Sequence, residues 1–198
     1  MAPGLLYHNG RFQSAHHVRA ATPLSRGDAM IIEDIEVKKF ADQPFCRDMS
    51  SDQVAALAAV LEKRRYPEGS VIFAEGKTDP FLFLLRDGSV ELTVESEYGR
   101  NEKGEKGYPF YTFGAGDIFG YLTFLDGRPH SANAIARTET VVYVLKRADF
   151  ERFMHDHPPT AFKIMQFIVL QVDDMARRMI HKFAQLSDYL FQGTGYGH

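Results

Sequence analysis

The sequence is poor in three features that would each narrow its function: cysteine, long apolar runs and excess positive charge. Cys46 is the single cysteine among 198 residues, so an internal disulfide is impossible and a reducing compartment is the default expectation. No apolar run reaches the roughly 18 residues of a membrane-spanning helix, and no apolar stretch of signal-peptide length opens the chain. The formal net charge of −3 argues against a general nucleic-acid-binding surface. We therefore expect a cytoplasmic protein without a membrane partner.

Histidine is also sparse where an enzyme would need it. None occurs between Val18 and His130, so the cluster of His and Glu on adjacent strands that a metal-dependent cupin-type enzyme requires is missing. His8, His16 and His17 share no helical or turn spacing, and we interpret them as solvated polar residues. A serine hydrolase would need a Gly-x-Ser-x-Gly elbow, which the sequence lacks. We expect a protein that is not an enzyme and that has no metal site.

What the sequence does contain is a series of short strand-like segments between helical ones. Residues 1–40 are weakly patterned and predict an irregular or mobile extension, with a possible strand at 31–35. Ser50 and Gln53 fit a capping box, which predicts a helix to about Arg64. Apolar or alternating segments follow, separated by Gly-rich turns, at 71–73, 81–85, 90–94, 108–113, 132–136 and 141–145. Their regular spacing predicts a mainly β, jelly-roll barrel over residues 41–157, flanked by helices.

The turns between these segments predict how the strands pair. Asp87-Gly88 is a hairpin signal that would join the segments at 81–85 and 90–94. Residues 96–107 are polar and charged, and we expect them to be the tip of a second hairpin. The segments at 132–136 and 141–145 are expected to form the last hairpin. A short helix is predicted from Arg147 to His155.

One continuous segment, Phe119–Ala134, has the pattern of a ligand cradle. A strand is predicted to end at Phe119, and Gly120 lets a ligand approach the backbone closely because it has no Cβ. One helical turn follows, and an Asp-Gly-Arg-Pro turn at 126–129 leads into the next strand. Free N–H groups at the start of such a helical turn favour negative charge. The segment therefore predicts a site for a small anion.

This segment resembles the phosphate-binding cassette of cyclic-nucleotide-binding domains. The family pattern is Phe-Gly-Glu-Leu-Ala-Leu followed, a few residues later, by Pro-Arg-Ser/Ala-Ala. The residues Gly120, Leu122, Pro129, Ser131 and Ala132 stand where the family has them. The resemblance implies that the ligand would contact Phe119, Gly120, Tyr121, Leu122, Thr123, Arg128, Pro129, His130, Ser131 and Ala132.

Three further segments extend the resemblance to roughly residues 48–186. Glu68–Gly76 is similar to the family's entry turn pair, Leu84–Val90 to its Ile-x-x-Gly-x-Val segment, and Gly114–Gly120 to its approach to the cassette. Their order and spacing imply the fold of a catabolite-activator-like sensor domain. The long C-terminal helix of that fold is expected at 158–190, with a tail at 191–198.

Two cassette positions depart from the family, and both concern the ligand. Tyr121 replaces the Glu that accepts a hydrogen bond from the ribose 2′-hydroxyl, and His130 replaces the Arg that pairs with the cyclic phosphate. Losing one partner of such a charge pair costs ~2–5 kcal/mol, so cyclic AMP or cyclic GMP is expected to bind weakly at best, and no cofactor is certain. A protonated His130 or an inward-turned Arg128 could replace the lost charge. Alternatively, Tyr121 and His130 simply fill the pocket.

The predicted long helix carries an unbroken heptad pattern. Apolar residues recur in steps of three and four at Phe162, Met165, Val169, Val172, Ala176, Met179, Phe183, Leu186 and Leu190. Such a seam predicts a homodimer, although the start of the seam is expected to pack on the barrel of its own chain. Ile168, Met175 and Ile180 widen the stripe, and Met175 and Ala176 are expected to face the ligand base. No residues of this sequence remain for a helix-turn-helix domain, so DNA recognition by that route is not expected.

Together these patterns predict a regulatory or sensor module that is not an enzyme. It would have a cyclic-nucleotide-binding fold with a degenerate cassette, take a small anion, and signal through the packing of helices in a dimer. The alternative hypothesis is a ligand-free dimeric interaction scaffold that has kept the fold.

Overall fold

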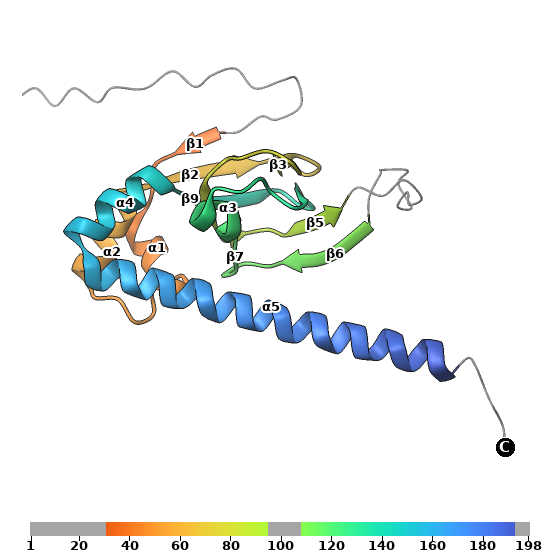
Figure 1. Ribbon diagram of the computed structural model, residues 1–198. Helices are drawn as coiled ribbons and strands as arrows, with labels where there is room; N and C mark the ends of the chain where they lie inside the picture. Colours follow the sequence, from red (N-terminus) through yellow and green to blue (C-terminus); the bar gives the residue numbers. More distant parts are fainter. Residues whose placement is uncertain (1–30, 95–107, 193–198) are drawn as a thin grey trace, which may run out of the picture.

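The computed structural model describes residues 31–94 and 108–192 and consists of two antiparallel sheets with helices at one end (Figure 1). The first sheet has the strand order β1 (Ile31–Glu33), β2 (Leu61–Tyr66), β9 (Thr140–Lys146), β4 (Phe81–Asp87), β7 (Ile118–Phe119). The second has the order β3 (Val71–Phe73), β8 (Asn133–Ala136), β5 (Val90–Val94), β6 (Tyr108–Phe113). The helices are α1 (Val37–Ala41), the 3₁₀ turn η1 (Pro44–Cys46), α2 (Ser51–Ala58), α3 (Tyr121–Asp126), α4 (Arg147–Asp156) and α5 (Pro158–Gln192). The predicted jelly-roll with a long C-terminal helix is confirmed.

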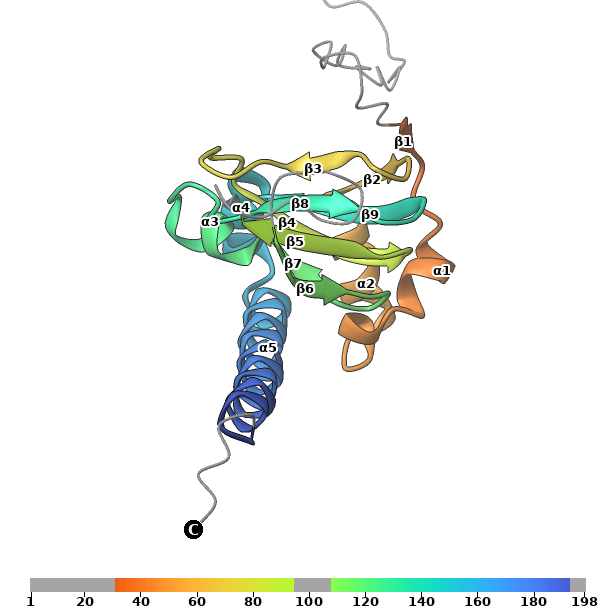
Figure 2. The same cartoon turned by 90° about the vertical axis from the view of Figure 1, so that its right-hand side faces the viewer.

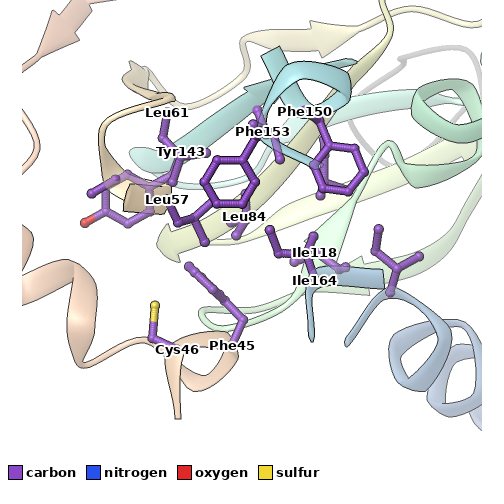
Figure 3. Packing of buried hydrophobic residues seen from close by; sticks show 14 of the residues in the cluster. Phe45, Cys46, Leu57, Leu61, Leu84, Ile118, Tyr143, Phe150, Phe153 and Ile164 are labelled. Atoms are coloured by element: carbon purple, nitrogen blue, oxygen red, sulfur yellow. The ribbon is translucent and has the colours of Figure 1, made fainter. Parts of the chain in front are cut away.

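The first sheet is buried on both faces, which explains the continuous apolar runs in its central strands. Along β4, Phe83 and Leu85 point into the core between the two sheets, whereas Leu82 and Leu84 point to the helices. Successive side chains of a strand lie on opposite faces. A strand between two cores is therefore buried on both faces and carries apolar residues on both. Figure 3 shows the helix-side core, in which Tyr143 of β9 lies among side chains from several helices.

Residues 31–41 are part of this packed domain. β1 pairs antiparallel with β2, with Ile32 opposite Arg64. The side chain of Phe40 on α1 is 0% exposed and meets Tyr143 edge to face, with ring centroids 4.9 Å apart. Residue 41, where the sequence suggested that the domain starts, is the last residue of α1. Residues 1–30 lie outside the described part of the chain.

The helix that follows is shorter than the sequence predicted. The capping box is present, since the Gln53 amide donates to Ser50 Oγ at 3.3 Å and the Ser50 amide donates to Gln53 Oε1 at 3.0 Å. The helix ends at Ala58, however, and the segment predicted as its last turn is strand β2. Its charged residues are good helix formers, but Glu62 is opposite Val144 in the ladder with β9. Pairing with β9 therefore decides the conformation of this segment.

Two of the predicted hairpins are wrong. β4 and β9 lie in the first sheet and β5 and β8 in the second, so neither β4–β5 nor β8–β9 is a pair. Each turn instead carries the chain from one sheet to the other. The two turns pack on each other: the Ser89 amide donates to Thr138 Oγ1 at 3.1 Å, and the Arg137 amide donates to the Ser89 carbonyl at 2.9 Å. The third hairpin, β5–β6, is confirmed, although its tip at 96–107 lies outside the described residues.

The long helix α5 packs its buried side chains on the domain in its first half. The predicted short helix appears as α4, and α5 begins two residues after α4 ends. Ile164 and Ile168 are buried against the helix-side core. Beyond Met175 every described side chain is exposed or half-buried, and the helix extends past the sheets (Figures 1 and 2). The second half of α5 therefore buries none of its described side chains, although Lys182 Nζ lies 6.0 Å from the centroid of the Tyr111 ring of β6.

Candidate functional site

The predicted cassette forms at the point where the first sheet ends. β7 stops at Phe119, and Gly120 has a left-handed backbone with φ of +78°. A Cβ at this position would lie 2.7 Å from the carbonyl oxygen of Phe81 and 2.9 Å from the ring of Phe83, so only glycine fits. Helix α3 follows, and Gly127 closes it with φ of +73°. The local geometry predicted for this segment is confirmed.

The cassette borders a cavity of about 420 Å³ between α3, the second sheet and α5. All ten residues that the resemblance implied as ligand contacts lie in its wall: Phe119, Gly120, Tyr121, Leu122, Thr123, Arg128, Pro129, His130, Ser131 and Ala132. Met175, expected to face the base, also lines it, but Ala176 does not belong to the lining. The sequence analysis missed five lining residues, which are Phe73, Leu92, Phe110, Phe113 and Asp126.

His130 is a buried residue of the cavity wall. Its side chain is 5% exposed and its ring stacks on Phe73 of β3, with centroids 3.8 Å apart and an angle of 7° between the planes. Nδ1 lies 3.0 Å from Thr123 Oγ1 and shares a hydrogen bond with it. Nε2 has no hydrogen-bond partner among the described residues. Burial lowers the pKa of His130, and the nearby backbone and carboxylate of Asp79 oppose this only in part.

The lowered pKa predicts that His130 makes folding sensitive to acid. The unfolded chain binds more protons than the folded one below the ordinary histidine pKa of ~6.5, so the free energy of unfolding falls as the pH falls through that range. The change His130→Phe keeps a ring against Phe73 but removes the titrating group, and it should reduce this loss. Urea midpoints of both proteins at about pH 7.5 and pH 5.5 measure the effect. An unchanged pH dependence would assign the acid sensitivity to groups other than His130.

Tyr121 connects the cassette to the long helix. Its side chain is 8% exposed, and its hydroxyl donates to the sulfur of Met175 on α5 at 3.1 Å. Burial raises the pKa of Tyr121, so the hydroxyl keeps its proton. Where the family has a carboxylate that could accept from a ribose, this chain has a phenol that contacts α5.

Arg128 lies at the rim of the cavity. Its guanidinium Nε donates to Asp126 Oδ2 at 2.6 Å, and its side chain is 81% exposed. It therefore does not take the inward position that would let it replace the missing phosphate-binding arginine. Its charge is balanced by Asp126 rather than available to a ligand.

Most of the predicted dimer seam lies on the exposed side of α5. The exposed members are Phe162, Val169, Val172, Ala176, Met179, Phe183 and Leu186, whereas Met165 is half-buried against the helix-side core. The expectation that the seam begins on the barrel is therefore wrong for Phe162 and holds for Met165. The barrel is contacted instead by Ala161, Ile164 and Ile168, together with Met175.

Other candidate chemistry is weaker in the described residues. Burial raises the pKa of the Cys46 thiol to about 12, so it stays protonated and unreactive. Within residues 31–94 and 108–192, no group of three His, Cys, Asp or Glu side chains could hold a metal ion. In the same ranges, no helix is both long enough and apolar enough to cross a membrane.

The domain resembles known proteins over most of its length. Residues 63–157 match the family model described as cyclic nucleotide-binding domain. The chain is 32% identical over 111 residues to the cAMP-dependent protein kinase regulatory subunit of Aspergillus niger, a match covering 56% of this chain and 25% of that protein. It is 30% identical over 131 residues to Glutaminase 1 of Bradyrhizobium diazoefficiens, covering 66% of this chain and 20% of that protein. The chain thus spans a quarter or less of each of these relatives.

A solved structure supports the same assignment at the level of the fold. The cyclic nucleotide-binding domain from Methylobacillus flagellatus superposes with a TM-score of 0.70 at 19% identity, covering 79% of this chain and 88% of that one. Its identity is too low to carry over a ligand. The domain nevertheless has the cyclic nucleotide-binding fold, and its residues 63–157 match the family model described as cyclic nucleotide-binding domain.

Proposed function

We propose that this chain is a non-enzymatic sensor module in which a small molecule enters the cassette cavity and changes the packing of α5. The observation that carries the proposal is the contact between Tyr121 and Met175, because it joins the cavity wall to the long helix through one half-buried hydrogen bond. A ligand that moves Tyr121 must break this contact or shift α5 with it. Binding energy would thereby bias the position of a helix that extends beyond the domain.

The relatives support a regulatory role rather than a chemical one. One of them is named as the regulatory subunit of a kinase, and the segment shared with the glutaminase covers 20% of that protein. We therefore assign to this chain the sensing of a ligand and not the activity of either relative.

We further propose that the signal is passed within a homodimer formed by α5. The apolar seam continues for several turns beyond the barrel, and Phe183, for example, is 72% exposed. Salt bridges on the same part of the helix, Asp173 to Arg177 and Asp174 to Arg178, give it charged flanks. An apolar stripe between charged flanks is the arrangement of a helix that pairs with another helix.

The dimer is tested with Val172→Glu, which places a carboxylate in the middle of the seam. Two such carboxylates would face each other in the dimer, so the variant should sediment as a monomer at micromolar concentration, where the wild type sediments as a dimer. Gln166→Glu is the matched control, since it adds the same charge to an exposed position outside the seam. A wild type that is already monomeric at that concentration would remove the dimer from the proposal.

Sensing through the cassette is tested by restoring the family residues. The double variant Tyr121→Glu/His130→Arg regains the ribose acceptor and the phosphate-binding cation, so it should bind cyclic AMP more tightly than the wild type. A ligand at 100 times its Kd adds ~2.7 kcal/mol, and each kcal/mol raises the midpoint of thermal unfolding by ~2–4 °C for a chain of this size. Tyr121→Glu alone is the control, because it adds a second negative charge and should show no gain.

The alternative, a ligand-free dimeric scaffold, is favoured by the two rings of Tyr121 and His130 in the cavity wall, which already have partners in Met175 and Thr123. It predicts that the double variant gains nothing from cyclic AMP although it folds. Thermal unfolding of the two variants with and without millimolar cyclic AMP decides between the two functions.

A further inference from the structure

Five of the sixteen residues that line the cassette cavity have phenyl or phenol rings. Phe73, Phe110, Phe113, Phe119 and Tyr121 all belong to its wall, from strands β3, β6 and β7 and from α3. Phe113 and Phe119 stack on each other with centroids 5.3 Å apart. Aromatic walls of this kind bind flat, apolar ring systems by stacking and edge contacts.

The charges around the cavity do not favour an anion. Among the described lining residues, the charged side chains are Asp126 and Arg128, and they neutralise each other at the rim. His130 is held neutral by burial, and the nearest charge acting on it is the carboxylate of Asp79. A cyclic phosphate placed here would lose its hydration and meet no unpaired cation among the described lining residues, which is costly for any buried charge.

One polar group of the wall is left without a partner. Nε2 of His130 is buried and makes no hydrogen bond among the described residues, while Nδ1 is engaged with Thr123. A buried polar atom without a partner destabilises the folded state, so native proteins satisfy nearly all of them. Nε2 is covered by protein atoms, so the imidazole ring would have to turn before a ligand group could exchange a hydrogen bond with it and remove this defect.

We propose that the cavity takes an uncharged ligand with a flat aromatic ring system and one hydrogen-bonding group that pairs with His130, in place of a cyclic-phosphate anion. The inference rests on the proposed sensing function and specifies the ligand class of the same site. The rings of β3, β6 and β7 hold the flat part of the ligand. The imidazole recognises the polar group, and the lack of a free cation rejects the charged analogue.

The test uses two pairs of probes that differ in charge. The pairs are adenosine with cyclic AMP and 2-naphthol with 2-naphthoate, each titrated into the full chain at neutral pH and followed by thermal unfolding and calorimetry. In each pair the neutral probe should bind at least about tenfold more tightly, a difference of ~1.4 kcal/mol. An anion that binds as tightly as its neutral partner in either pair overturns the proposal, as does the absence of binding by both neutral probes at millimolar concentration.

The variant His130→Phe tests the polar contact separately. It preserves a ring against Phe73 and the neutral charge, and it should weaken 2-naphthol binding by roughly threefold to tenfold, as expected for one hydrogen bond. An unchanged affinity would overturn the assignment of the contact to His130.

The restored double variant Tyr121→Glu/His130→Arg separates this inference from the proposed function. If it binds cyclic AMP while the wild type binds neither neutral probe, the inference on ligand class is wrong and the sensing function stands. If neither the wild type nor the folded double variant binds any of the probes, the cavity is closed to ligands and both are wrong.

Discussion

Replacing Phe40 with alanine is expected to lower the free energy of unfolding by about 3–5 kcal/mol, as is typical for removing a buried aromatic ring from a core. The side chain is 0% exposed and contacts the rings of Tyr143 and Phe45. The surrounding strand and helix residues cannot collapse onto the space it leaves without losing their own contacts. Urea-induced unfolding, followed by circular dichroism, measures the change.

The result bears on the extent of the domain, because α1 precedes the 63–157 segment that matches the family model. Val37→Ala is the control on the same helix: Val37 is 45% exposed, so its truncation should change the free energy of unfolding by no more than about 0.5 kcal/mol. If Phe40→Ala were as mild as Val37→Ala, α1 would not be an integral part of the domain.

The change Gly120→Ala is expected to lower the free energy of unfolding by about 2–5 kcal/mol. A residue with a Cβ costs ~1–2 kcal/mol in the left-handed region, and overpacking adds ~1–3 kcal/mol because the new methyl would lie 2.7 Å from the Phe81 carbonyl oxygen. The overlap of the new methyl group with Phe81 can be relieved only if β7 or α3 moves. Ligand binding should therefore weaken together with stability. Thermal unfolding, with and without whichever probe binds the wild type, measures both.

Gly69→Ala separates the two contributions to that cost. Gly69 has a similar φ of +82°, but a Cβ there would meet no atom within 4 Å. Its substitution should therefore cost only the backbone part, ~1–2 kcal/mol. Equal losses for the two variants would show that the contact between Gly120 and β4 is not tight.

Local sequence patterns were sufficient for most strands but not for their pairing. The runs in β4 and β9 are apolar because both faces are buried, and β5 begins and ends at the predicted residues. By contrast, the charged segment of β2 is a strand only because β9 pairs with it. The turn at Asp87-Gly88 could join two strands of one sheet or connect the two sheets. The outcome depends on the second turn, at 137–138, that packs against it. The local sequence carries no information about that distant contact.

In the candidate site, too, the residues of one local segment could be predicted, whereas contacts from distant segments could not. The ten cassette residues come from one continuous segment, so the resemblance placed all of them in the cavity wall. Phe73, Leu92, Phe110 and Phe113 come from three other strands. Strand alternation indicates that such residues point inward, but not which of them border the cavity and which fill the core. The partner of Tyr121 on α5 depended on how the long helix lies across the barrel.

The form of α5 gives small movements near the cassette a large effect. At ~1.5 Å per residue, the part of the helix from Met175 to its end at Gln192 is about 26 Å long, and along it Lys182 Nζ lies 6.0 Å from the centroid of the Tyr111 ring of β6. In the proposed function, this part of the helix would act as a lever with its pivot near the Tyr121 contact. A tilt of about 10° at Met175 would displace the far end by about 4–5 Å, by the same helix geometry. Such a sideways displacement would be enough to separate the end of the apolar seam from the partner helix in the proposed dimer.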